Sequence, residues 1–138
     1  MNSFVVDASV TLAWCLPGQA TSASENALKQ LGAGVTALAP CIWPAEVANG
    51  LWSAERRGEL SRSQAVGILN LLRSLPVVVD HQLPVRVFDA VRELASQYRI
   101  TVYDASYLDT AIREQLPLAT LDRALLRAAR EAGLKVIS

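Results

Sequence analysis

Four acidic residues of this sequence have the types and positions that metal-ion chemistry needs. They are Asp7, Glu46, Asp104 and Asp122. Oxygen ligands without His or Cys suit hard divalent cations such as Mg²⁺ and Mn²⁺. Such ions, held by a few carboxylates and water, characteristically engage phosphate groups. The four acids therefore indicate a divalent-metal site that acts on phosphates, provided that the fold brings them together.

The elements that must position these acids follow from short apolar runs that alternate with helix-length segments. The predicted strands span residues 4–6, 35–38, 76–79, 117–121 and 135–137. The predicted helices span about 8–16, 22–32, 44–57, 61–74, 84–98, 103–115 and 122–132. This alternation implies right-handed crossovers and a mainly parallel sheet with helices on both faces. We therefore expect one α/β domain over residues 1–138, with a central parallel five-stranded sheet flanked by about seven helices.

This outline places the acids at one edge of the sheet. Asp7 ends the first predicted strand, and Asp122 directly follows the fourth. Glu46 lies in the first turns of the helix after the second strand, and Asp104 opens a later helix. Because the carboxyl ends of parallel strands share one edge, where ligand crevices form, at least three of the acids should converge there. Asp104 could join them.

Helix phase predicts opposite directions for two carboxylates of the helix at 103–115. Asp104 shares a face with mostly apolar side chains, namely Tyr107, Leu108, Ala111 and Ile112. Its carboxylate should therefore point inward. Asp109 falls on the opposite face with Arg113, four residues later, and we expect an exposed ion pair worth about a few tenths of a kcal/mol.

Glu46 lies at the margin of the apolar stripe of its own helix. That stripe consists of Trp43, Val47, Gly50, Leu51 and Ala54. Asn49, Ser53 and Arg57 continue the polar row that begins at Glu46. The row is typical of one wall of a polar groove.

A purely structural interpretation of the acids also exists. Asp is common at helix starts, where it caps free N–H groups and favours the positive end of the helix dipole. Asp7, Asp104 and Asp122 could each be only a cap. Taken together, clustered carboxylates repel one another and raise one another's pKa values, and a bound cation would resolve that repulsion.

Composition narrows the class of protein. The 138 residues carry 13 basic and 13 acidic side chains, so net charge does not point to nucleic acid. The basic residues are unevenly spread, because only Lys29 precedes Arg56. Cys15 and Cys41 form no metal or redox motif and are expected to be reduced core residues of a cytoplasmic protein. We expect no signal peptide and no membrane partner.

Four short motifs, in this order, resemble those of the PIN-domain ribonucleases, and more closely the VapC-type toxins of bacterial toxin–antitoxin pairs. They are "VVDASV", "WPAEVANGL", "TVYDASYLDTA" and "ATLDRAL". The resemblance covers essentially the whole chain. It implies a PIN fold, with acids gathered at the carboxyl edge of a parallel sheet, and Mg²⁺- or Mn²⁺-dependent hydrolysis of RNA phosphodiester bonds.

Carried over residue by residue, the resemblance assigns the four acids to the family's acidic site. Asp7 and Asp104 would be the main ligands of one or two ions, and Glu46 and Asp122 direct or water-mediated ligands. The hydroxyl residues Ser9 and Thr120 match family positions beside the first and last acid, and with Asn49 they would support the ligands by hydrogen bonds. Asp109 departs from the family pattern, since a small or apolar residue usually follows that Tyr-Leu pair.

Arginines near the acids are candidate RNA contacts. Arg123, Arg127 and Arg130 share one face of the helix after Asp122, and Arg57 ends the Glu46 row. A solvated helix face explains the Arg123 row equally well. The resemblance further implies a cognate antitoxin, often one that plugs the acidic site with a basic side chain, and a homodimer that could use apolar surface of the helices at 44–74.

Two other functions compete with the ribonuclease. An inactive PIN-like module that only holds RNA or a protein is disfavoured because all four acids are present. A phosphatase or receiver-type domain would need a Lys near the acids, and the only lysines, Lys29 and Lys135, do not follow strand ends there.

Overall fold

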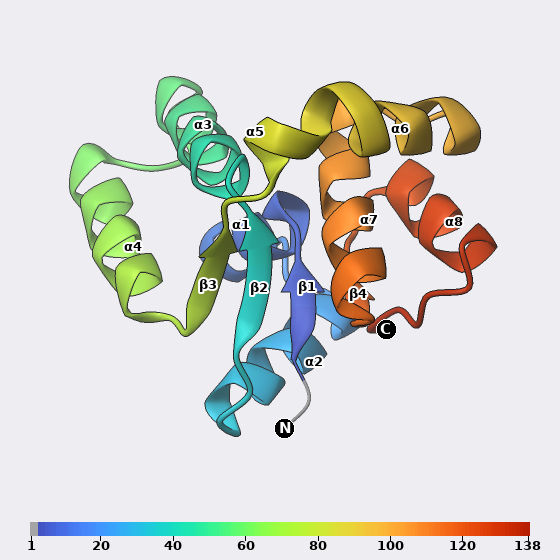
Figure 1. Ribbon diagram of the computed structural model, residues 1–138. Helices are drawn as coiled ribbons and strands as arrows, with labels where there is room; N and C mark the ends of the chain where they lie inside the picture. The colour runs from blue at the N-terminus through green and yellow to red at the C-terminus, as the bar shows by residue number, and fades with distance from the viewer. Residues whose placement is uncertain (1–2) are drawn as a thin grey trace.

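The computed structural model describes residues 3–138 and has a four-stranded sheet at its centre (Figure 1). The strands are β1 (Phe4–Val6), β2 (Ala37–Pro40), β3 (Val77–Asp80) and β4 (Leu118–Ala119). They lie in the order β3-β2-β1-β4, and all three pairings are parallel. The expected α/β class and parallel sheet are confirmed.

The prediction of a fifth strand is wrong. The segment at 135–137 forms one isolated parallel bridge, between Leu118 and Val136. Leu118 exchanges two hydrogen bonds with this segment, to the Lys135 carbonyl and from the Ile137 N–H, each 3.0 Å long. This segment therefore pairs with the two-residue β4 through Leu118 alone.

Helical segments occur at all seven predicted places in the described chain. They are α1 (Ala8–Cys15), α2 (Ser22–Gly32), α3 (Trp43–Arg56), α4 (Arg62–Ser74), the run of α5 (Leu83–Arg86), a π-helical turn (Val87–Val91) and α6 (Arg92–Tyr98), then α7 (Val102–Glu114) and α8 (Arg123–Glu131). The predicted helix at 84–98 is thus one continuous helical run whose middle is wound more loosely.

Side-chain caps fix where several helices begin. Ser61 and Gln64 form a capping box at α4, and Thr21 and Ser24 form another at α2. The Thr101 hydroxyl accepts the Asp104 N–H at the start of α7. Each cap satisfies N–H groups that the first helical turn leaves without a partner.

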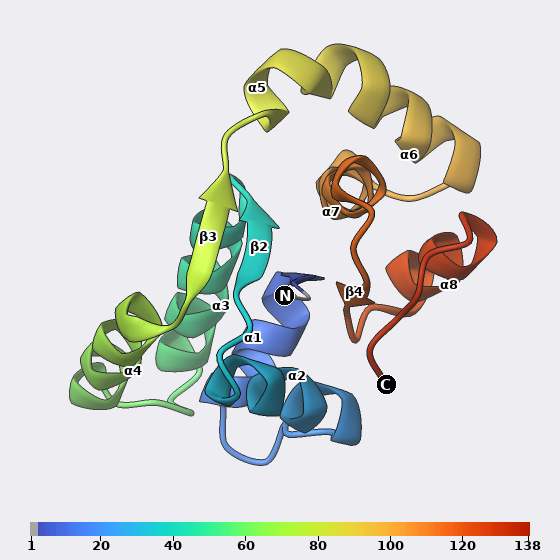
Figure 2. The same cartoon turned by 60° about the horizontal axis from the view of Figure 1, so that its bottom comes forward.

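Helices cover both faces of the sheet, as Figures 1 and 2 show together. Helix α7 lies on one face against β1, β2 and β4, with the α5–α6 run packed on its outer side. Helices α1, α2 and α3 lie on the other face, α4 lies beyond β3, and α8 lies beyond β4. None of the helices in residues 3–138 has both the length and the apolar character that a bilayer crossing requires.

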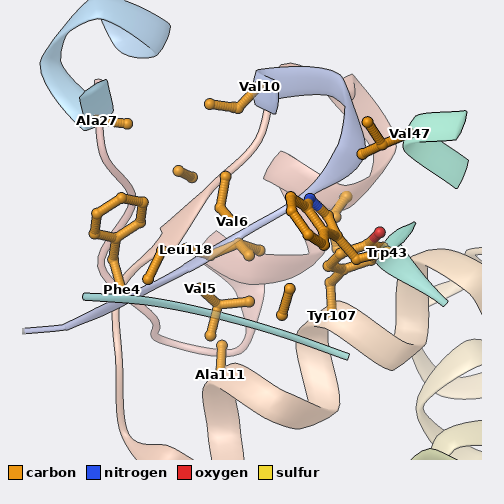
Figure 3. Packing of buried hydrophobic residues seen from close by; sticks show 14 of the residues in the cluster. Phe4, Val5, Val6, Val10, Ala27, Trp43, Val47, Tyr107, Ala111 and Leu118 are labelled. Atoms are coloured by element: carbon orange, nitrogen blue, oxygen red, sulfur yellow. The ribbon is translucent and has the colours of Figure 1, made fainter. Parts of the chain in front are cut away.

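Strand β1 forms the centre of the core because both of its faces are covered. Phe4, Val5 and Val6 are completely buried, and Figure 3 shows them in one cluster with side chains from the surrounding helices. The three arrowheads of β1, β2 and β3 point the same way in Figure 1, so their carboxyl ends form one edge. Cys15 and Cys41 are half-buried free thiols, and burial raises the pKa of Cys15 to about 11.

Candidate active site

Asp7 is buried at the carboxyl end of β1 and is held by several hydrogen bonds. Its Oδ1 atom accepts the Ser9 hydroxyl at 2.6 Å and the Val10 N–H at 3.0 Å, and its Oδ2 atom accepts the Thr120 hydroxyl at 2.5 Å. The Val10 bond makes Asp7 the N-cap of α1, so the capping role and a place in the site coexist. Burial raises the pKa of Asp7, while these hydrogen bonds oppose the rise.

The two hydroxyl residues also fix the segment that carries Asp122. Ser9 Oγ accepts the Leu121 N–H at 2.9 Å, and Thr120 Oγ1 accepts the Asp122 N–H at 3.0 Å. Asp122 then caps α8 through the Leu125 N–H at 2.9 Å. Asp7 and Asp122 are therefore joined by two short hydrogen-bonded links between β1 and the start of α8.

Glu46 lies in the first turn of α3, where its Oε1 atom accepts the Tyr107 hydroxyl at 2.5 Å. Tyr107 comes from α7 and is 1% exposed. Burial first, and then the Glu46 carboxylate, raise the pKa of Tyr107 above its usual range. A protonated phenol thus links the helix of Glu46 to the helix of Asp104.

The four acids act on one another electrostatically. The pKa of Asp104 is raised to about 6, by partial burial and then by the charges of Asp122, Asp7 and Glu46. The charge of Asp122 also raises the pKa of Asp7. Hydrogen bonds link the segments that carry these acids. Ser9 and Thr120 join Asp7 to the Asp122 segment, and Tyr107 joins Glu46 to the helix of Asp104.

The donor set of this cluster fits a hard divalent cation. Its ligand atoms are carboxylate oxygens from four elements, and a cation would relieve their repulsion. Within residues 3–138, no three His, Cys, Asp or Glu side chains are already grouped closely enough to hold an ion. Hydroxyl groups hold the carboxylates of Asp7 and Glu46 in place.

The family model of the PIN domain matches residues 4–131 of this chain, from β1 to the end of α8. The chain belongs to the PIN domain family. This PIN domain is 33% identical to ribonuclease VapC3 of Pyrobaculum aerophilum over 121 residues, which cover 88% of this chain and 90% of that protein. The resemblance to VapC-type proteins is thereby confirmed.

Two crystal structures show the same fold as this PIN domain. The structure of PAE2754 from Pyrobaculum aerophilum superimposes with a TM-score of 0.72 at 27% identity, covering 99% of this chain and 84% of that one. The structure of FitAcB from Neisseria gonorrhoeae gives a TM-score of 0.60 at 18% identity, covering 98% and 96% of the two chains.

The prediction that Asp109 is exposed is wrong. Asp109 is 4% exposed, and its carboxylate accepts two hydrogen bonds from Arg86, each 2.8 Å, and one from Arg113 at 3.1 Å. Arg113 also donates to Asp80 at 2.8 Å. Burial would raise the pKa of Asp109, but the two guanidinium groups lower it below its ordinary value. The α5–α6 run covers the outer face of α7, which the helical wheel treated as solvent-facing.

The predicted arginines lie on the surface, and two of them have partners within the protein. Arg57 is paired with Glu59 at 3.0 Å at the end of α3. Arg127 donates a hydrogen bond of 2.8 Å to the carbonyl of Tyr98, the last residue of α6. Arg123 is exposed in the first turn of α8. RNA contacts by Arg57 would compete with its Glu59 pair, whereas Arg127 keeps N–H donors besides the one that bonds Tyr98.

The described structure shows no contact that supports the predicted role of Asn49 beside a ligand. Asn49 is exposed on α3, and within the described residues its side chain makes no hydrogen bond to a site acid.

Sequence reasoning missed Thr11, whose hydroxyl donates to the Asp7 carbonyl at 3.0 Å and accepts Trp43 Nε1–H at 2.9 Å. It placed Tyr107 on the same helix face as Asp104 and gave its hydroxyl no role. The available signal was its phenol, since a buried Tyr hydroxyl usually has a hydrogen-bond partner.

Proposed function

We propose that this PIN domain is an endoribonuclease that hydrolyses RNA phosphodiester bonds with one or two Mg²⁺ or Mn²⁺ ions. The observation that carries the proposal is the hydrogen-bonded placement of four acids: Ser9 and Thr120 tie Asp7 to the Asp122 segment, and Tyr107 ties Glu46 to the helix of Asp104. The 33% identity to a protein named ribonuclease VapC3 supports RNA as the substrate.

The residues have different tasks in this proposal. Asp7 and Asp104 hold the ion, while Glu46 and Asp122 bind it directly or through water. A bound divalent ion lowers the pKa of water and polarises phosphoryl oxygens. Ser9 and Thr120 keep both oxygens of Asp7 directed, since each donates to a different one.

A single substitution tests this function. Asp7→Asn removes the charge but keeps an oxygen that can accept the Val10 N–H, and Asn is as good an N-cap as Asp. We expect a folded variant that no longer cleaves RNA in the presence of Mg²⁺, measured by the release of new 5′ ends from cellular RNA. Cleavage at the wild-type rate by pure Asp7→Asn protein would refute the proposal. RNA that is bound but never cut by the wild type would instead favour an inactive binding module.

We also propose that the enzyme is the toxin of a toxin–antitoxin pair, acts in the cytoplasm and forms a homodimer. The likeness to ribonuclease VapC3 over 88% of the chain supports the toxin role. Co-expression with the product of a small neighbouring reading frame tests it. The toxin role predicts growth arrest that this product relieves, and arrest that Asp7→Asn does not cause.

A further inference from the structure

Tyr107 is placed between the acid-bearing elements rather than beside a single acid. It lies on α7 three residues after Asp104, so the two residues share one face of that helix. Its ring belongs to the buried cluster of Figure 3, together with Trp43 of α3 and the β1 residues. Its hydroxyl leaves this cluster and reaches Glu46 on α3.

The hydroxyl has one side-chain partner in the described structure, the Oε1 atom of Glu46 at 2.5 Å. The backbone of Ala8, directly after Asp7, also interacts with it and opposes the rise in the pKa of Tyr107. A phenylalanine would fill the same core space without placing a polar group there. Since burying a hydroxyl is unfavourable unless it is hydrogen-bonded, this hydroxyl must be explained by its partner.

Glu46 needs an external restraint to have a defined orientation. It is half-buried on α3, its side chain has several rotatable bonds, and its charge is repelled by that of Asp104. A fixed donor on Oε1 leaves Oε2 as the freer oxygen for an ion or a water molecule. The donor comes from α7, which also carries Asp104, so one rigid helix sets both carboxylates.

We infer that Tyr107 is a positioning residue that holds Glu46 in the orientation required for divalent-metal binding and RNA hydrolysis. The inference rests on the proposed function. It complements the observed support of Asp7 by Ser9 and Thr120, because it gives Glu46 an equivalent hydroxyl donor from a different element.

Tyr107→Phe is the direct test, because it removes one oxygen and keeps the ring. We expect a folded protein in which Mn²⁺ binds roughly 10-fold or more weakly, measured by electron paramagnetic resonance of free Mn²⁺, with a similar loss of RNA cleavage. Thr110→Val is the matched control. It also removes a buried hydroxyl from α7, but that hydroxyl donates to the Ser106 carbonyl of the same helix, so Mn²⁺ affinity should not change.

A double-mutant cycle separates positioning from general stabilisation. Tyr107→Phe should weaken Mn²⁺ binding in the wild type and have no further effect in Glu46→Gln protein. Wild-type Mn²⁺ affinity in Tyr107→Phe, or an equal loss in both backgrounds, would overturn the inference. Mn²⁺ binding is measured without RNA, so a wild-type protein that binds Mn²⁺ but cuts no RNA refutes the proposed function while the cycle still reports on Tyr107.

A measurement on the native side chain covers the case in which Tyr107→Phe does not fold. The chain has three tyrosines, so their ring signals can be assigned in selectively ¹³C-labelled protein with Tyr98→Phe and Tyr103→Phe. Addition of Mg²⁺ should shift the Tyr107 signal in the wild type and leave it unchanged in Glu46→Gln. A Tyr107 signal that Mg²⁺ saturation leaves unmoved in the wild type would contradict the inference.

Discussion

The buried charge network around Asp109 gives a quantitative prediction about stability. Asp109 joins α7 to the α5–α6 run through Arg86, and Arg113 extends the network to the end of β3 through Asp80. Asp109→Asn keeps the size and shape of the side chain and removes its charge. The free energy of unfolding should fall, because two partly buried guanidinium groups lose their shared carboxylate.

The size of the loss follows from the three hydrogen bonds that Asp109 accepts. A hydrogen bond to a charged group contributes about 1.5–3 kcal/mol. The Asn oxygen can still accept one of them, and the side chains of Arg86 and Arg113 retain 32% and 21% exposure, so water partly compensates. We therefore expect a loss of about 2–4 kcal/mol in total, or a fall of roughly 6–12 °C in Tm for a domain of this size.

The pH dependence of this loss has a definite sign. The pKa of Asp109 is lowered in the folded protein, so its contribution is fully present above the unfolded pKa of about 3.9 and is lost as the pH falls through the folded value. The difference in stability between wild type and Asp109→Asn should thus be constant from pH 7 to pH 5. It should shrink below about pH 4.

Urea and thermal unfolding followed by circular dichroism would measure both effects. Glu59→Gln is the control, since it breaks the Arg57–Glu59 pair, whose side chains are 55% and 49% exposed, and should leave Tm unchanged. A Tm for Asp109→Asn equal to that of the wild type at pH 7 would refute the reasoning. So would a difference that persists undiminished at pH 3.

Three further predictions follow from the site and the helices. Asp104→Asn should stabilise the metal-free protein at pH 7 by about 1–2 kcal/mol, because the pKa of Asp104 is raised to about 6 and its charge destabilises the fold above that pH. The gain in unfolding free energy, measured by chemical denaturation, should vanish below about pH 4. Gly67→Ala should raise the unfolding free energy by about 0.5–1 kcal/mol, because an added methyl meets nothing within 4 Å. Gly50→Ala should bring no such gain, because its methyl would overlap the Leu12 side chain; equal gains of the two variants in urea titrations would contradict this reasoning. Arg123→Gln should reduce the slope of log RNA affinity against log salt by about 1, measured by fluorescence anisotropy, and an unchanged slope would indicate a merely solvated arginine.

The sequence predicts the sheet edge well because its signals are local. The apolar run of β1 followed by Asp7 defines a strand end, and the helix start at Asp122 follows from capping rules. The alternative that Asp104 caps its helix is wrong, because Thr101 is the N-cap and accepts the Asp104 N–H. The start of β2 differs from the prediction because the preceding residues still bond to the end of α2. The Val35 N–H, predicted in a strand, bonds instead to the Gln30 carbonyl at the end of α2, so β2 begins at Ala37.

The errors share one physical cause, because each depends on packing between distant segments. A helical wheel has no information on a second layer, so it assigned Asp109 to solvent although the α5–α6 run covers that face of α7. The hydrogen bond between Tyr107 and Glu46 joins residues 61 positions apart, and no local pattern encodes such a contact. The segment predicted as the last strand forms only one bridge to β4, at Leu118, and the sequence of the segment itself does not encode that limit.

The position of a bound ion tests the central proposal most directly. Crystals of the wild-type protein grown with Mn²⁺ should give an anomalous peak within coordination distance of Asp7 and Asp104, near Glu46 and Asp122, and the peak should be absent from Asp7→Asn crystals. A fully occupied Mn²⁺ elsewhere, with these four carboxylates unliganded in a protein that cleaves RNA, would contradict the account.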